Sequence, residues 1–465
     1  MFRVDDSWPL RRIRDDLTRY DIHPPLYFWL LHAQFLVSGA TPWAFVLLNF
    51  ILGALTIVMV FAVGRRLWDP STGAAAALLW AVSHGALITS LNARPYALAA
   101  LLTLFLLRLA IIMHERSGRP ALSQSLFLGA VMLLGLLTHY QFPFVIVAVG
   151  IGLVLAGYND RPRRAIVFGV LALVAFAAFA SLLPGFVASL ERQRAQTPSF
   201  TAGDLPWRLR RFALGLLGLA RPAYDRSYLA ILSVLLALGS LWRSVRAGAL
   251  RRVSGSGRLL REAAAGVKLV AWTTIALTVF TALLYLLHLS PPHAVGDRYN
   301  ASLWPLFALL IAGAVRAVVP DRMALTLLAL AIFLLTYQLA ARIDAEQQAL
   351  VTSREWRTLS VARVVVADHS QRGILPRTVL RVPAISPLWI GGSSTDPDSL
   401  MKELRGKGAP VTFLLNRDLG DPRVRRAMEK AVATGDSLVS VGVVPGETEV
   451  VVWTPARLRQ TPRSE

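Results

Sequence analysis

The chain has 465 residues, 55% of them hydrophobic, and a mean hydropathy of +0.52. Soluble globular domains rarely reach these values, which are typical of multispan membrane proteins. The net charge of +21 comes without a nucleic-acid-binding motif, so it indicates cytoplasmic loops and contacts with anionic lipid or phosphate rather than a nucleic-acid partner. The lack of cysteine excludes disulfides, thiolate metal sites and cysteine nucleophiles.

The first predicted element begins after His23-Pro24-Pro25. Proline lacks an N–H and its ring crowds the preceding turn, so the two prolines predict a helix start with His23 near the cap. Such a helix end attracts anions, although a plain helix start at the membrane surface explains the pattern equally well. The helix over 26–38 is too short to span comfortably, and its aromatic residues predict that it lies in the membrane interface.

The chain then shows about ten apolar segments long enough to span a bilayer. They lie near residues 43–64, 73–90, 95–113, 121–138, 142–157, 165–187, 227–242, 268–289, 301–319 and 323–341. The predicted fold class is therefore an all-α polytopic membrane protein.

Basic residues in short loops predict the orientation, because such loops are retained in the cytoplasm. One set of connections carries Arg65, Arg66, Arg116, Arg119, Arg161, Arg163, Arg164, Arg316 and Arg322, whereas the alternate short ones carry Arg94 and Arg298. The first set is predicted to be cytoplasmic, which places the N-terminus outside. We therefore expect the complete protein to have one more span upstream of Met1.

Hydropathy falls after about residue 343, where strand-like runs alternate with helix-like stretches. The runs are 364–366, 411–415, 438–444 and 450–452, and the helical stretches lie around 398–407 and 421–434. This pattern predicts a small α/β domain that caps the protein or docks an acceptor. The predicted domains are an external loop with interfacial helices (1–42), a transmembrane domain (43–342) and an external soluble domain (343–465).

Polar residues near span ends gather on the predicted external face, several of them beside proline, which lets a helix open toward a cavity. They include Asp5, Asp6, His23, Asn92, Arg94, Tyr96, His139, Tyr140, Asp297, Arg298 and Tyr299. Polar groups at membrane depth are costly and so are functional candidates. Snorkelling arginines, aromatic-belt tyrosines and a capping histidine are the alternative interpretations.

Arginine and histidine at a membrane face suit a phosphate with a lipid tail, because the guanidinium fork matches phosphate oxygens. A nearby carboxylate can take a proton from an acceptor hydroxyl. Together these groups predict transfer from a lipid phosphate. The histidines show no metal-ligand spacing, so neither a metal nor another cofactor is expected.

Five motifs carry a resemblance over about residues 5–340 to the GT-C membrane glycosyltransferases. They are His23-Pro24-Pro25-Leu26-Tyr27, Gly64-Arg65-Arg66-Leu67-Trp68, Asn92-Ala93-Arg94-Pro95-Tyr96, His139-Tyr140 and Asp297-Arg298-Tyr299. The chain is most similar to the branch with protein O-mannosyltransferases, lipid A aminoarabinose transferases and lipopolysaccharide-core galacturonosyltransferases. The resemblance implies inverting transfer of a sugar from a polyprenyl-phosphate donor to a glycan, lipid or protein acceptor on the extracytoplasmic face.

The resemblance also implies roles for single residues. His23 and Arg94 would contact the donor phosphate, and Arg298 and Tyr299 would form a second phosphate contact. Tyr27, Asn92, Tyr96, His139 and Tyr140 would line the cavity. The family's catalytic Asp-Glu pair follows its first span, which this sequence lacks, and Asp5-Asp6 lies nearest that place as the implied general base.

Two other functions are open at this stage. A transporter or flippase for a lipid-linked sugar would need polar groups at mid-membrane, whereas segments such as 43–64 and 165–187 are apolar in their middles. An inactive membrane scaffold is the second alternative, because the Asp-Glu pair is missing.

Overall fold

The computed structural model describes residues 10–20, 23–38, 42–91, 94–115, 121–157, 162–185, 188, 191, 257–286 and 300–318, and five strands between 364 and 454. The chain divides into two compact units. One comprises Val4–Leu339, and the other comprises Ala340–Glu465 together with Met1–Arg3.

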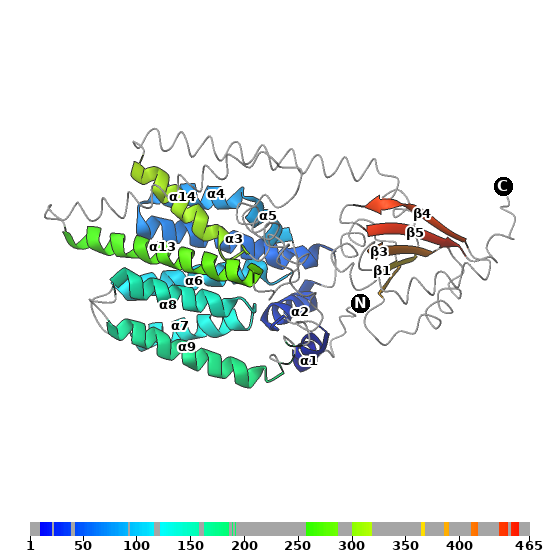
Figure 1. Cartoon of the computed structure of the whole chain (residues 1–465), viewed down its shortest axis with the longest axis horizontal. Helices are drawn as coiled ribbons and strands as arrows, with labels where there is room; N and C mark the ends of the chain where they lie inside the picture. Colours follow the sequence, from blue (N-terminus) through cyan, green and yellow to red (C-terminus); the bar gives the residue numbers. More distant parts are fainter. Residues whose placement is uncertain are drawn as a thin grey trace. The chain divides into compact units, whose positions relative to one another are not determined.

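The first unit is helical. Its described helices are α1 (Leu10–Tyr20), α2 (Leu26–Ser38), α3 (Pro42–Leu67), α4 (Pro70–Ala81), α5 (His84–Leu91), α6 (Tyr96–Glu115), α7 (Leu122–Leu136), α8 (Phe142–Gly157), α9 (Pro162–Leu182), α13 (Gly257–Leu286) and α14 (Trp304–Val318). Helix α13 packs on α8, α3 packs on α4 and α6, and α7 packs on α9. The long helices lie side by side, with α1 and α2 at one end of the bundle (Figure 1).

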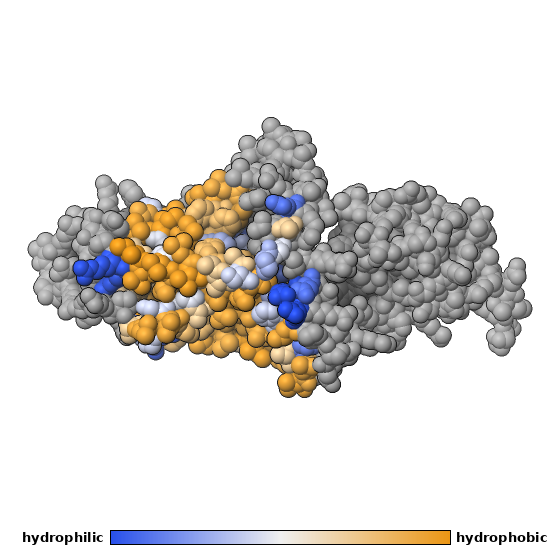
Figure 2. Space-filling view, turned by 90° about the horizontal axis from the view of Figure 1, so that it is seen from below, coloured by the Kyte–Doolittle hydropathy of each residue, from blue (hydrophilic) through white to orange (hydrophobic). Residues whose placement is uncertain are grey.

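Four helices of the described part are long and apolar enough to cross a membrane, namely Leu47–Leu67, Tyr96–Glu115, Arg163–Leu182 and Ala265–Leu284. Large apolar side chains such as Phe50 and Leu173 are about 70% exposed, as expected of lipid-facing positions. Figure 2 shows one face on which hydrophobic residues form a broad band between hydrophilic ends. The chain is therefore an integral membrane protein.

The expectation of about ten spans is not supported, because the described helices α7, α8 and α14 comprise only 15, 16 and 15 residues. The predicted spans 227–242 and 323–341 lie outside the described residues.

The prediction of one continuous span over 73–90 is wrong, because α4 ends at Ala81 and α5 begins at His84. The backbone N–H of Val82 donates to the Leu78 carbonyl, while the Ser83 hydroxyl accepts from the N–H of Ala86 at 3.1 Å, as an N-cap does. Gly85 lies against the ring of Trp304, where a Cβ atom would collide. Helix α14 therefore packs directly on this break.

Glycine also brings α3 and α4 close together. A Cβ added to Gly64 would lie 2.8 Å from the Cα atom of Gly73, so the two backbones are in contact. Small residues permit such close packing between membrane helices. The largest fully buried side chains of the surrounding core are Trp80, Tyr27 and Phe142.

The second unit contains a five-stranded sheet with strand order β2-β1-β3-β5-β4. The strands are β1 (Val364–Ala367), β2 (Ser386–Trp389), β3 (Val411–Asn416), β4 (Ser437–Val444) and β5 (Thr448–Thr454). Strand β1 is parallel to β2 and β3, whereas β5 is antiparallel to β3 and β4. All four predicted strand runs fall within these strands. The predicted helices of this region lie outside the described residues, so the α/β class of the unit stays a prediction.

Candidate active site

The start of α2 is joined to the end of α7. The first N–H groups of a helix have no partner within the helix, and the last carbonyls have none either. Here the N–H of Leu26 donates to the carbonyl of Leu137 at 2.9 Å. Pro24 and Pro25 are buried and have no N–H to satisfy. This bond places His23 beside the turn that follows α7.

That turn, residues 137–141, is closed by its own hydrogen bonds. The N–H of His139 donates to the Gly135 carbonyl, and the N–H of Phe142 donates to the His139 carbonyl. The N–H of Gln141 donates to Nδ1 of His139 at 3.2 Å. Nδ1 is engaged as an acceptor in this bond, so Nε2 is the ring nitrogen that can donate to a ligand. The residue is 2% exposed, so the turn holds a buried imidazole.

Rings from three parts of the chain meet here. The ring of His23 lies 6.0 Å from that of His139, 6.1 Å from that of Tyr140 and 6.2 Å from that of Phe28. His139 stacks on Tyr140 at 4.4 Å, and the ring of Tyr96 lies 5.3 Å from that of His139. These five residues are called the ring cluster below. It joins α2, α6 and the α7–α8 turn.

Arg94 lies at the break between α5 and α6 and is half-buried. Nδ2 of Asn49, on α3, donates to its backbone carbonyl at 3.3 Å. Tyr27 is fully buried, and its hydroxyl has no hydrogen-bond partner among the residues that the structure describes. Burial raises the pKa of the Tyr27 phenol, and the positive charge of Arg94 acts in the opposite direction. Arg94 therefore lies within electrostatic reach of a buried phenol.

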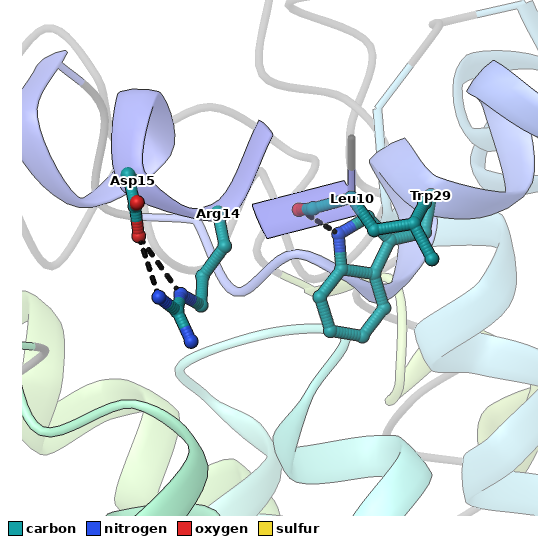
Figure 3. A network of polar contacts seen from close by, with 4 residues as sticks. All are labelled: Leu10, Arg14, Asp15 and Trp29. Carbon is teal, nitrogen blue, oxygen red and sulfur yellow. Dashed lines mark hydrogen bonds and ion pairs between the residues drawn. The ribbon is translucent and has the colours of Figure 1, made fainter. Parts of the chain in front are cut away.

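Helix α1 is attached at the same end of the unit. The indole N–H of Trp29 on α2 donates to the carbonyl of Leu10 at 3.0 Å, and Arg14 pairs with Asp15 at 2.8 Å (Figure 3). Trp29 thus holds the N-terminal helix against the helix that carries Tyr27 and Phe28. The carboxylate of Asp15 is exposed and already engaged by Arg14.

A hollow adjoins the ring cluster through Gln141, the residue after Tyr140. It is small and lies between α8, α13 and the residues that precede α14. Its lining is mainly apolar and consists of Gln141, Phe144, Val145, Leu277, Thr281, Leu284, Ser302 and Leu303.

The structure brings six of the predicted site residues to one end of the helical unit: His23, Tyr27, Arg94, Tyr96, His139 and Tyr140. The other five, Asp5, Asp6, Asn92, Arg298 and Tyr299, lie outside the described residues. In the part of the chain that is described, no group of three His, Asp or Glu residues could hold a metal ion.

Asn49 is not among the site residues predicted from the sequence. This residue is a lone amide in the apolar run from Pro42 to Val63, and a polar residue within such a run marks a functional candidate. That signal was present in the sequence, but the partner of the amide lies in a distant segment.

The chemistry of the assembled groups favours the binding of an anion. A guanidinium and two imidazoles can bind phosphate oxygens, and the buried phenol offers one more donor. Partial burial strengthens each of these interactions relative to water.

Residues 22–184 match the family model of the dolichyl-phosphate-mannose-protein mannosyltransferases. Among solved structures, the chain is similar to ArnT from Cupriavidus metallidurans in the apo state, with 12% identity and a TM-score of 0.57 over 98% of this chain and 94% of that one. ArnT bound to undecaprenyl phosphate gives 13% identity and a TM-score of 0.52 over the same shares. No curated protein sequence matches the chain.

The matched segment holds every described residue of the ring cluster, together with Arg94 and Tyr27. Residues 22–184 thus resemble the dolichyl-phosphate-mannose-protein mannosyltransferases, and the chain shares its fold with ArnT over nearly its whole length.

Proposed function

We propose that the protein transfers a sugar from a polyprenyl-phosphate donor to an acceptor on the extracytoplasmic face of the membrane. The observation that carries this proposal is that Arg94 lies two residues before Tyr96 of the ring cluster and within electrostatic reach of the buried phenol of Tyr27. A phosphate whose lipid tail lies between helices would find its cationic partner at this end. ArnT, which shares the fold, has been solved bound to undecaprenyl phosphate.

In the proposed reaction, a carboxylate takes the proton of the acceptor hydroxyl, and the resulting oxygen attacks the anomeric carbon of the sugar. The bond between that carbon and the phosphate oxygen breaks with inversion, and the polyprenyl phosphate leaves. Arg94 balances the negative charge that develops on the departing phosphate. His23 and the Nε2–H group of His139 donate hydrogen bonds to the same phosphate. Asp5 or Asp6 is the proposed base.

The remaining residues of the site complete this proposal. Arg298 and Tyr299 supply a second phosphate contact, while Asn92, Tyr96 and Tyr140 line the cavity. The sheet unit forms an external α/β domain that docks the acceptor. The acceptor is a glycan, a lipid or a protein, and the transferred sugar is a hexose or a pentose.

The test is the replacement of Arg94. Membranes that contain the Arg94→Ala variant should release sugar from a polyprenyl-phosphate donor about 100-fold more slowly, because removal of one transition-state donor costs about 10²–10³ in kcat. Arg94→Lys should keep part of the activity, since it keeps the charge but loses the fork.

Arg163→Ala is the matched control, because it removes one arginine from an exposed position at the start of α9. Its turnover should stay within about twofold of wild type. Wild-type turnover in Arg94→Ala would show that this guanidinium has no role at the phosphate.

A further inference from the structure

The backbone of Arg94 is contacted by a side chain of α3. Arg94 precedes Pro95, and a residue before proline is disfavoured in the helical conformation, so the backbone breaks between α5 and α6. A break leaves the local backbone less constrained than a continuous helix would. A contact from outside these two helices can therefore help to set where the Arg94 side chain leaves the backbone.

Asn49 makes the contact that can do this. Its side chain is completely buried, and its Nδ2 donates to the Arg94 carbonyl at 3.3 Å across 45 residues of sequence. A buried amide in an apolar membrane helix is costly unless it is hydrogen-bonded. Neighbouring Leu48 and Phe50 are apolar, so the amide is the one group on this turn of α3 that can hold a backbone carbonyl.

Gly53 lies one turn further along α3, on the same face as Asn49. A Cβ atom at Gly53 would collide with the hydroxyl oxygen of Ser90, which belongs to α5. Helix α3 therefore touches α5 closely just before the chain reaches Arg94. Two residues of α3 thus contact the segment around Arg94. Gly53 allows α5 to pack closely, and Asn49 hydrogen-bonds the Arg94 carbonyl at the break.

We propose that Asn49 is a positioning residue that sets the location of the Arg94 guanidinium relative to Tyr27 and the ring cluster. It acts through Arg94 and does not contact the substrate. This inference rests on the proposed function of Arg94 as the phosphate contact. A displacement of about 1 Å in such a group can cost about 100-fold in rate, so a single backbone hydrogen bond is enough to matter.

The test is a double-mutant cycle between Asn49→Leu and Arg94→Ala in the full-length protein, because Arg94→Ala removes the side chain that Asn49 is proposed to position. Its readouts are kcat and KM for sugar release, and the Kd of the purified protein for undecaprenyl phosphate. We expect Asn49→Leu to lower kcat/KM at least tenfold in the wild-type background and less than twofold in the Arg94→Ala background. Thr56→Val is the control, because Thr56 is also buried on α3 and its hydroxyl donates to Leu52 in the same helix.

A second pair of variants keeps the inference testable if Asn49→Leu fails to fold. Gly53→Ala should displace α5 and lower kcat/KM, whereas Gly53→Ala with Ser90→Ala should recover activity, because the colliding oxygen is gone and the Ser90 Cβ lies 3.5 Å away.

The outcomes separate the two proposals. Equal effects of Asn49→Leu in both backgrounds, or an equal loss in Thr56→Val, would overturn the positioning role alone. Wild-type activity and affinity in Arg94→Lys and Arg94→Ala would overturn the phosphate role of Arg94, and the positioning role with it.

Discussion

Arg164 is a buried cation at the end of α6 opposite the candidate site. Its side chain is 8% exposed, and its guanidinium donates to the carbonyl of His114 in the last turn of α6. Carbonyls of the last helical turn lack partners within the helix, and a cation there also interacts favourably with the helix dipole. Arg66 supports the same end by pairing with Glu115. Two arginines from different helices thus hold one helix terminus.

We expect Arg164→Met to lower the free energy of unfolding by about 1.5–3 kcal/mol, the usual contribution of a hydrogen bond to a charged group. The neighbouring Arg163 is exposed, so Arg163→Met should change stability by less than about 0.5 kcal/mol. Thermal unfolding of both variants in detergent measures the difference. Equal melting temperatures would show that the buried hydrogen bond contributes nothing net.

Asp69 is the N-cap of α4 and lies in the short connection between the end of α3 at Leu67 and the start of α4 at Pro70. Its Oδ1 accepts from the N–H of Thr72 at 2.8 Å and its Oδ2 from the Thr72 hydroxyl at 2.9 Å, while Ser71 also donates to it. Burial raises the pKa of this carboxyl, but these hydrogen bonds and the charge of Arg316 outweigh it and lower the pKa to about 2.

This lowered pKa has a consequence for stability. In the unfolded chain the pKa of Asp69 is about 3.9. The ionised carboxylate therefore stabilises the folded protein fully above that pH, and this stabilisation is lost as the pH falls toward about 2. Asp69→Asn keeps a capping oxygen without the titration. The melting temperature of the wild type should therefore fall more steeply between about pH 4 and pH 2 than that of Asp69→Asn. Parallel curves for the two proteins would rule out this linkage.

At the scale of elements, the α7–α8 turn depends on a glycine. Gly135 faces the ring of Phe142, which is fully buried, and a Cβ atom there would collide with it. The turn that carries His139 and Tyr140 lies between these two residues. The close contact of Gly135 with Phe142 thus sets how the two helices meet below the ring cluster.

Gly135→Ala should therefore destabilise the protein by about 1–3 kcal/mol through overpacking and should reduce sugar transfer. Gly169 is also helical, on α9, and has no atom within 4 Å of its Cβ position. Gly169→Ala should instead be neutral or stabilising by up to about 1 kcal/mol, because alanine favours the helix. Melting temperatures and turnover of the two variants check this contrast. Equal melting temperatures and turnover in the two variants would mean that the Phe142 ring can move away from residue 135 at no energetic cost.

At the scale of the whole molecule, the basic loops and the candidate site are expected on opposite sides of the membrane. Arg65 and Arg66 end α3 at one end of the helical unit, and α1 lies at the other (Figure 1). The chain contains no cysteine, so single cysteines can report which end faces the cytoplasm.

Arg11 and Arg65 are both exposed and suit this purpose. A membrane-impermeant maleimide should label Arg11→Cys in intact cells, and Arg65→Cys only after permeabilisation, because short basic loops are retained in the cytoplasm. Labelling of Arg65→Cys alone in intact cells would reverse the orientation and place the candidate site in the cytoplasm.

Local patterns predicted much of the architecture. Helices α3, α6 and α9 follow from apolar runs, since only a helix satisfies its own backbone in lipid. The runs of valine and other apolar residues over 364–366 and 450–452 predicted β1 and β5. The break between α4 and α5 was missed, because Ser83 and Gly85 are too weak as local signals. The packing of Trp304 on Gly85 is invisible in that part of the sequence.

By itself, the sequence determined that this is a membrane protein whose polar residues stand near helix ends beside proline, since hydropathy and proline chemistry are local properties. Only the tertiary structure decided which of these polar residues lie close to one another. The bond from Leu26 to Leu137 brings His23 to His139, and Asn49 reaches Arg94 from another helix. Such meetings depend on how closely helices pack, and that distance is set by single small residues such as Gly53 and Gly135 whose partners lie far away in the chain.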